Sequence, residues 1–206
     1  MSEQRTTRRS TEQVRALIIS AAAEEFGGRG FEQTTMRTVA DAAGISPSVL
    51  HRHFPSKDRL FAATTLTPFI ASVEEFAASW QQQLASERSE HEIMTDLIRD
   101  LYRHLNEHRL TLVRLISMPD LTDGELVDAL RDGLTQVIAS LKPIGDHEAD
   151  RAGWFSRDVV ERAVSMTLTL MTGLVLMRPW IEPDAEEDEL VQAATNYALH
   201  GIRLAP

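Results

Sequence analysis

The sequence lacks cysteine altogether. This absence excludes disulfides, thiolate nucleophiles and cysteine-ligated metals, and it agrees with the cytoplasmic location that we expect. Long apolar runs are also missing, because the longest uncharged run, between Arg162 and Arg178, has fifteen residues. A membrane span needs about 18 or more, so we expect no membrane association and interpret this run as a buried core helix. The basic, polar residues 1–10 do not resemble a signal peptide.

Positive charge is scarce, since the formal net charge is −10. DNA-binding domains are usually basic, so this total argues at first against nucleic acid. The charge is uneven, however: residues 1–63 hold nine Lys/Arg against seven Asp/Glu, and the rest of the chain is strongly acidic. Because charges are screened over about 8 Å at physiological salt, the local balance matters most to a phosphate. The N-terminal third is therefore compatible with DNA binding.

No alternating strand pattern occurs, and apolar residues recur at helical spacing along nearly the whole chain. A first helix is predicted over residues 11–26, ended by Gly27, Gly28 and Gly30. Two short helices follow, the first capped by Thr34 or Thr35 and the second by Ser46. Ser56 begins a fourth helix, which Pro68 either kinks or ends.

Longer amphipathic helices are predicted in the remainder. One covers residues 127–141 and is stopped by Pro143 and Gly145, with a polar loop over 143–153. An apolar helix over 156–177 follows and is ended by Arg178-Pro179. A last helix runs to about Arg203, with the acidic run 184–189 placing carboxylates in its first turn. The predicted fold is all-α, with a three-helix helix-turn-helix head, a C-terminal helical bundle and about nine helices in total.

The short helices carry the pattern of a helix-turn-helix motif. Ala40 is the small residue where two helices cross, and Gly44 lies in the turn, where positive φ must be tolerated. The inward apolar positions are Val39, Ala43, Ile45 and Leu50. The exposed face of the next helix is then left with side chains that hydrogen bond to phosphates or base edges: Ser48, His51, Arg52 and His53.

The stretch from Gly30-Phe31 through Val39-Ala40 and Ala43-Gly44-Ile45-Ser46 to Leu50-His51-Arg52-His53-Phe54-Pro55-Ser56-Lys57 resembles the N-terminal signature of the tetracycline-repressor (TetR) family. That signature reads Gly-Phe, a Thr, Ile/Val-Ala, Ala-Gly-Val-Ser, Leu-Tyr-x-His-Phe and a Lys. The match covers about residues 11–62. His51 stands where the family usually has a phosphate-contacting Tyr, so DNA affinity is expected to depend on pH between about 5 and 8.

The resemblance implies roles for individual residues. Thr35, Arg37, His51 and Lys57 would bind phosphates, whereas Ser48, Arg52 and His53 would face the major groove. The full predicted DNA-binding set is Thr35, Arg37, Ser46, Pro47, Ser48, His51, Arg52, His53 and Lys57. The predicted domains are a flexible basic arm over 1–10, a DNA-binding domain over 11–62, and a ligand-sensing and dimerisation domain over 63–206.

The resemblance further implies a one-component, ligand-responsive regulator that binds a palindromic double-stranded DNA operator as a homodimer. Repression is favoured because most members of the family repress. A small, largely apolar effector would release the operator from a pocket predicted at Phe69, Phe76, Met94, Tyr102, Met118, Met166 and Met171. The dimer seam is predicted in the last two helices, at Ala163, Leu168, Gly173, Leu174, Ala194, Tyr197, Ala198 and Gly201.

Two alternatives stay open. The first is a DNA-binding protein without any small-molecule response. The second is a zinc hydrolase, because His104, Glu107 and His108 match the pattern H-x-x-E-H, which places both histidines on one helix face. No third ligand is evident in the sequence, so we expect no metal, no cofactor and no enzymatic activity.

Overall fold

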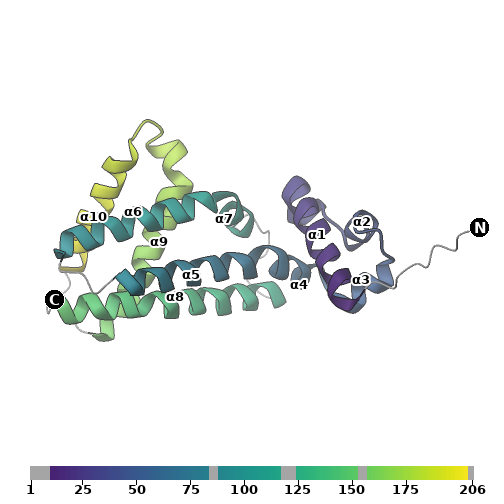
Figure 1. Ribbon diagram of the computed structural model, residues 1–206. Coiled ribbons are helices and arrows are strands. Elements are labelled where there is room, and N and C mark those ends of the chain that lie inside the picture. Colours follow the sequence, from purple (N-terminus) through teal and green to yellow (C-terminus); the bar gives the residue numbers. More distant parts are fainter. Residues whose placement is uncertain (1–9, 84–87, 117–123, 153–156, 204–206) are drawn as a thin grey trace, which may run out of the picture. The chain divides into compact units, whose positions relative to one another are not determined.

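The structure, a computed structural model, describes residues 10–83, 88–116, 124–152 and 157–203 (Figure 1). Within these ranges all regular elements are helices, ten α-helices and one π-helical turn, and the predicted all-α fold is confirmed. The chain forms two compact units. The first comprises Met1–Pro68 with Met118–Leu130, and the second comprises Phe69–Ser117 with Arg131–Pro206. Each unit is described by itself.

The first unit contains α1 (Thr11–Gln33), α2 (Met36–Ala42), α3 (Pro47–His53), α4 (Lys57–Phe61), the π-helical turn η1 (Ala62–Leu66) and the first residues of α8. Hydroxyl caps begin its α-helices, because the side chains of Ser10, Thr35, Ser46 and Ser56 each accept a backbone N–H three residues further on. Such a cap stabilises a helix by about 1 kcal/mol. The caps predicted at Ser46 and Ser56 are confirmed, and Thr35 rather than Thr34 caps α2.

The end of α1 differs from the prediction. The helix continues through Gly27 and Gly28 and changes direction at Gly30, whose φ of 77° lies in the left-handed region that glycine adopts without strain. Aromatic packing holds the two sides of this bend. The rings of Phe26 and Phe31 lie 5.0 and 5.1 Å from the ring of Phe61, so both sides of the bend pack against the same side chain of α4.

Pro68 neither ends nor interrupts the helix that begins at Ser56, since α4, η1 and α5 (Thr67–Gln83) follow one another directly. A proline in a helix lacks its N–H and collides with the preceding turn. The wider turn of η1 lies just before Pro68, and the Thr67 N–H there donates to the Ala62 carbonyl, five residues back. The Thr64 hydroxyl donates to the Leu60 carbonyl at 2.9 Å. The π-turn thus accommodates the proline.

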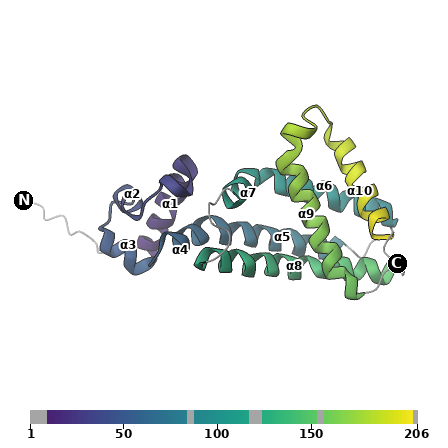
Figure 2. The same cartoon turned by 180° about the vertical axis from the view of Figure 1, so that it is seen from behind.

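The second unit contains most of α5, α6 (Glu90–Glu107), α7 (Arg109–Ile116), the greater part of α8 (Glu125–Ala152), α9 (Arg157–Ile181) and α10 (Glu187–Arg203). Helix α6 packs against both α9 and α10, and α5 and α8 lie side by side in both views (Figures 1 and 2). Helices α5 and α8 run in the same direction, because Glu74 accepts from Gln136 and Gln81 donates to the Ser140 carbonyl. The largest fully buried side chains here include Trp80 and Tyr102.

Two helices run through prolines that were expected to end them. Helix α8 continues through Pro143 and Gly145, so the loop predicted over 143–153 is wrong. Gly145 serves close packing instead, since a Cβ there would lie 2.6 Å from Val160 Cγ1. Helix α9 continues past Pro179 to Ile181. Pro179 cannot donate to the Val175 carbonyl, and Arg109 Nε donates to that oxygen at 3.4 Å.

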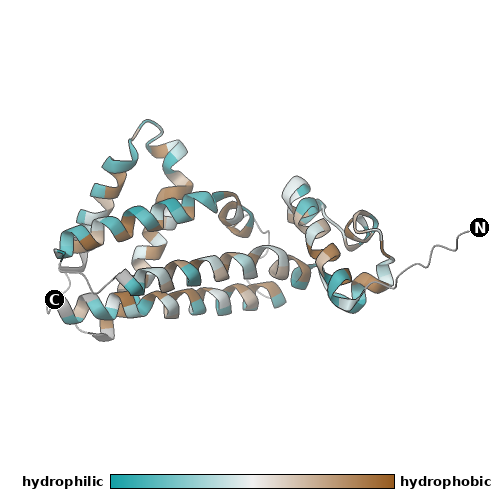
Figure 3. Ribbon diagram, in the orientation of Figure 1, coloured by the Kyte–Doolittle hydropathy of each residue, from teal (hydrophilic) through white to brown (hydrophobic). Residues whose placement is uncertain are grey.

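Helix α9 is much less buried than its composition suggests. From Val159 to Ile181 it is long and apolar enough to cross a membrane by length and hydropathy alone, yet only 22% of its most apolar window is buried. Brown, apolar segments of α9 are visible in Figure 3. The interpretation as a buried core helix is therefore wrong for the single chain.

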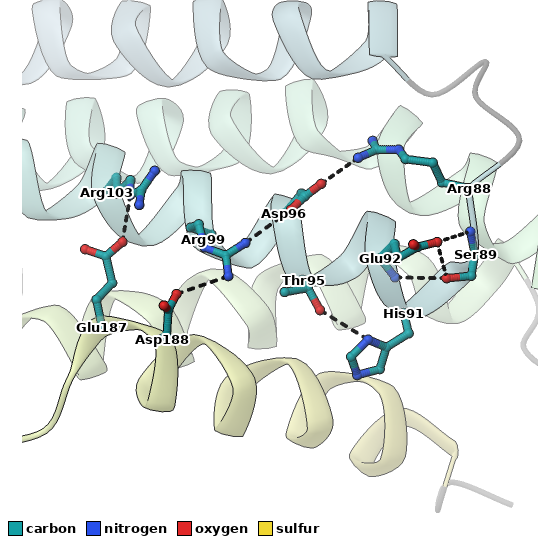
Figure 4. Close-up of polar contacts among 10 residues, drawn as sticks. All are labelled: Arg88, Ser89, His91, Glu92, Thr95, Asp96, Arg99, Arg103, Glu187 and Asp188. Atoms are coloured by element: carbon teal, nitrogen blue, oxygen red, sulfur yellow. Dashed lines mark hydrogen bonds and ion pairs between the residues drawn. The ribbon is translucent and has the colours of Figure 1, made fainter.

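The predicted acidic first turn of α10 is confirmed, and its carboxylates also reach α6 (Figure 4). Glu187 Oε1 lies 2.7 Å from Arg103 Nε, and Asp188 Oδ1 lies 3.2 Å from Arg99 Nη2. Arg99 also pairs with Asp96 of its own helix at 3.2 Å. The hydrogen bond that Arg103 donates to Glu187 raises the pKa of Arg103. Exposed pairs stabilise little individually, but together they set the position of α10 along α6.

Candidate nucleic-acid interface and effector cavity

The helix-turn-helix consists of α2, the turn at Gly44 and α3. Val39, Ala40 and Leu50 are fully buried and form the shared core of the two helices. Gly44 has a φ of 64°, and the Ile45 N–H donates to the Ala40 carbonyl at 3.0 Å. This positive φ is the reason why the turn needs glycine. The predicted small crossing residue and turn residue therefore both lie where the motif requires them.

Five of the nine predicted DNA-binding residues lie on α3, and the other four lie on α2, on α4 or at the caps of α2 and α3. Seven of the nine residues in that set are exposed, and the two others, His53 and Lys57, are half-buried; the exposed ones are Thr35, Arg37, Ser46, Pro47, Ser48, His51 and Arg52. Two hydroxyls of the set already serve as helix caps. Ser46 Oγ accepts from the Val49 N–H at 3.4 Å and lies 3.0 Å from Ser48 Oγ.

Lys57 is held by the end of α1. Its Nζ donates to the Phe31 carbonyl at 3.0 Å and lies 4.1 Å from the centre of the Phe31 ring. A cation over an aromatic face is worth about 0.5–1 kcal/mol at exposed sites. Lys57 thus fastens α4 to α1, a role that the sequence pattern did not suggest.

Glu125 in the first turn of α8 is a further residue that sequence reasoning missed. Its carboxylate accepts from Arg59 Nη2 at 2.9 Å and from Arg59 Nε at 3.2 Å. It also accepts from the hydroxyl of Ser56, the cap of α4, at 2.9 Å. The hydrogen bonds from Arg59 and then Ser56 lower the pKa of Glu125. The contact joins residues more than sixty positions apart, and no spacing in the sequence indicates it.

A cavity of about 80 Å³ lies among α6, α8, α9 and α10 of the second unit. Of the predicted effector residues, Met94 lines it, and so do three residues predicted for the dimer seam, Ala163, Leu168 and Ala198. The other predicted effector residues lie elsewhere: Phe69, Tyr102 and Met171 are buried in the core, Phe76 is half-buried, Met166 is 59% exposed, and Met118 is outside the described residues.

The remaining seam residues are spread over α9 and α10. Gly173 has nothing within 4 Å of its Cβ position, and Tyr197 is 61% exposed. Leu174 is half-buried and Ala194 is buried, while the surroundings of Gly201 lie outside the described side chains. Sequence reasoning missed two strongly exposed side chains of α9, Met177 at 46% and Trp180 at 72%. Their helical spacing from Gly173 was the available signal.

The histidine pair of the zinc-hydrolase alternative packs against α5. The rings of His104 and His108 are 4.9 Å apart, and His104 Nε2 lies 3.3 Å from Ser72 Oγ. Burial, and next the neighbouring His108, lowers the pKa of His104. Within the described residues no group of three or more His, Cys, Asp or Glu side chains could hold a metal ion. The zinc alternative therefore gains no support.

Similarity to a family model covers the helix-turn-helix, whereas similarity of fold to solved structures covers nearly the whole chain. The family model for bacterial regulatory proteins of the tetR family matches residues 18–64. The HTH-type transcriptional regulator TcmR of Streptomyces glaucescens is 36% identical over 84 residues, 41% of this chain and 34% of that protein. The HTH-type transcriptional repressor KstR2 of Mycolicibacterium smegmatis is 29% identical over 158 residues, 68% of this chain and 73% of that protein. The matches to TcmR and the next curated relatives span 22% to 34% of their length.

Among solved structures, the regulator FadR from Bacillus subtilis in complex with stearoyl-CoA has a TM-score of 0.66 at 16% identity, over 91% of this chain and 98% of that chain. At this identity the likeness concerns the fold, and it extends through the helical body. The helices of the first unit and the match over residues 18–64 are those of the helix-turn-helix class. The helix-turn-helix part of this chain is therefore similar to the bacterial regulatory proteins of the tetR family.

Proposed function

We propose that this protein is a transcriptional repressor that binds a palindromic DNA operator as a homodimer and releases it when a small molecule binds the body. One observation carries the DNA-binding part. Leu50 anchors α3 in the core while Ser48, His51 and Arg52 on the same short helix stay exposed. A helix with this division presents its polar face to the major groove in a fixed orientation. The relatives named as transcriptional regulators support the same assignment.

Within this interface we assign two kinds of contact. Arg52 is the candidate for reading a guanine, because its guanidinium can donate two hydrogen bonds to one base. Arg37, exposed on α2, would bind a phosphate and position the head without reading sequence. Ser48 and His53 would complete the base-facing set. Thr35, His51 and Lys57 would complete the phosphate set.

The experiment is selection of bound duplexes from a random DNA pool at fixed salt, followed by titration of single-base variants of the selected site. Arg52→Ala should lower discrimination at one base pair by about 1–3 kcal/mol. Arg37→Ala, which removes the same charge, is the matched control and should weaken all sequences alike and reduce the salt dependence. An unchanged specificity ratio for Arg52→Ala would contradict the assignment, and failure to select any site would contradict DNA binding itself.

The dimer is supported by the two apolar faces of α9. Val160 and Met171 are fully buried, whereas Met166, Gly173 and Met177 face outward. At 100° per residue the two sets lie roughly 130° apart around the helix. A single chain leaves the outer face exposed, and a second copy of α9 would cover it about a two-fold axis. Two heads would then reach half-sites about 34–36 Å apart.

Sedimentation of the full chain tests this seam. Met177→Glu should convert the dimer to a monomer, because a charge on a covered apolar face has no partner. Leu110→Glu is the control, since Leu110 is a similarly exposed apolar residue on α7, at 65%. It should leave the dimer intact. If the two variants had the same sedimentation coefficient, the proposed dimer interface on α9 would be wrong.

The effector response is supported by the cavity among α6, α8, α9 and α10. A ligand that binds one conformation better shifts the population toward it, and a change from mostly bound to mostly released operator takes about 5.5 kcal/mol of differential affinity. A regulator without such a response would keep its operator affinity with every compound tested. A screen for compounds that raise the melting temperature separates the two cases, because a ligand that binds only the folded state raises it.

A further inference from the structure

The lining of the cavity has very little polar character. Fourteen of the described residues line it, and among them Glu90 and Thr167 are the ones with polar side chains. A carboxylate or phosphate buried against such an apolar wall would lose its hydration at a large cost in free energy. The chemistry of the wall therefore disfavours fatty acids, acyl-CoA thioesters and other anions.

The size of the cavity restricts the occupant further. Its volume of about 80 Å³ compares with roughly 150 Å³ for an apolar cavity that binds benzene, and with about 300–1,000 Å³ for pockets of drug-sized ligands. One wall is rigid, because Gly145 and the fully buried Val160 hold α8 and α9 in close contact. The opposite wall contains Met94 and Leu97, which are half-buried on α6. Both have flexible, unbranched Cβ positions, so a modest rearrangement there admits a single ring.

From this wall and this volume we propose that the cavity binds a small, neutral, hydrocarbon-like molecule, about the size of one six-membered ring or a short alkyl chain. The assignment rests on the proposed ligand-responsive function and specifies the chemical class of the effector. It separates this protein from the FadR of Bacillus subtilis, whose structure contains stearoyl-CoA.

Helix α8 contributes residues to the cavity and, at its start, to the first unit. Leu141 and Ile144 of this helix line the cavity, and Glu125 at its start is bound by Arg59 and Ser56 at the beginning of α4. The helix is continuous from Glu125 to Ala152. Helix α8 therefore carries cavity residues in its later turns and the partner of Arg59 in its first turn.

The test is a thermal-shift titration of the full chain without DNA, with toluene, hexanoate and stearoyl-CoA as probes. Toluene at about ten times its dissociation constant should raise the melting temperature by roughly 3 °C or more, and the two anions should give no shift. A larger shift with hexanoate or stearoyl-CoA than with toluene would overturn the proposal.

Three variants test whether toluene binds in this cavity. Thr167→Leu fills it and should abolish the toluene shift, whereas Thr167→Val, of nearly the same size as threonine, should keep it. Leu97→Ala enlarges the cavity and should add a shift with naphthalene that the natural protein lacks. An unchanged toluene shift in Thr167→Leu overturns the assignment, and so does the absence of a naphthalene shift in Leu97→Ala. If Thr167→Leu does not fold, the naphthalene experiment with Leu97→Ala decides.

Operator binding is measured with the same samples without ligand. This measurement separates the proposed DNA binding from the proposed chemical class of the cavity ligand. If the natural protein binds its selected operator but toluene causes no shift, the chemical class assigned to the cavity is wrong and DNA binding stands. If toluene binds as expected but no DNA is selected, the proposed function is wrong and the cavity assignment stands as a binding site.

Discussion

Replacing Gly145 by alanine should strain the contact between α8 and α9. The added Cβ would lie 2.6 Å from Val160 Cγ1 and 3.2 Å from Val164 Cγ2, whereas carbon atoms are best separated by about 3.5–4.0 Å. Val160 is fully buried, and a β-branched residue in a helix is nearly confined to one rotamer. The clash is therefore relieved only if the helices separate by about 1 Å.

The magnitude follows from two opposing effects. Overpacking of a filled contact costs about 1–3 kcal/mol, and replacing a glycine by alanine inside a helix gains about 1 kcal/mol. Gly28→Ala isolates the second effect, because Gly28 lies in α1 with nothing within 4 Å of its Cβ position. The difference between the two variants is then about 1–3 kcal/mol, and for a chain of this size each kcal/mol corresponds to about 2–4 °C in melting temperature.

Thermal unfolding followed by circular dichroism measures this difference. Gly28→Ala should melt slightly above the natural protein, and Gly145→Ala should melt about 2–12 °C below Gly28→Ala. If both variants melted at the same temperature, α8 and α9 would not be in the close contact that the structure shows, and the glycine would have only a conformational role.

Three further changes test the electrostatic features. His51→Ala should weaken operator binding, measured by fluorescence anisotropy, to a similar extent for all sequences, because a phosphate contact carries no sequence information; an unchanged affinity would contradict a phosphate contact by His51. Burial lowers the pKa of His104, so the unfolded state takes up a proton first as pH falls below about 6.5, and the folded state loses stability. The melting temperature should therefore fall less between pH 7 and 5 in His104→Gln, and identical slopes would refute this. The lowered pKa of Glu125 means that its contribution is present above its ordinary pKa and is lost in acid. Glu125→Gln should accelerate amide exchange in α4 at neutral pH, with Glu74→Gln as a control that leaves α4 unchanged.

The elements that were predictable from sequence depend on short-range interactions. A hydroxyl that caps a helix bonds to an N–H three residues away, and Gly44 needs only its own backbone to adopt positive φ. The pattern from Ala40 to Leu50 therefore predicted the helix-turn-helix correctly. Local signals were misleading where packing opposed them: Pro143 and Pro179 were expected to end helices that continue, because neighbouring helices hold them in place.

By itself the sequence determined the all-α class, the helix-turn-helix and the exposed polar face of α3, since each follows from helical period, turn chemistry and caps within a few residues. Only the tertiary structure decided what each apolar residue of the body does. Met94, Ala163, Leu168 and Ala198 line one cavity, although the same residue types elsewhere on these helices are core or surface. Helical spacing establishes that a face is apolar, but the neighbouring helices determine whether that face meets core, cavity or solvent.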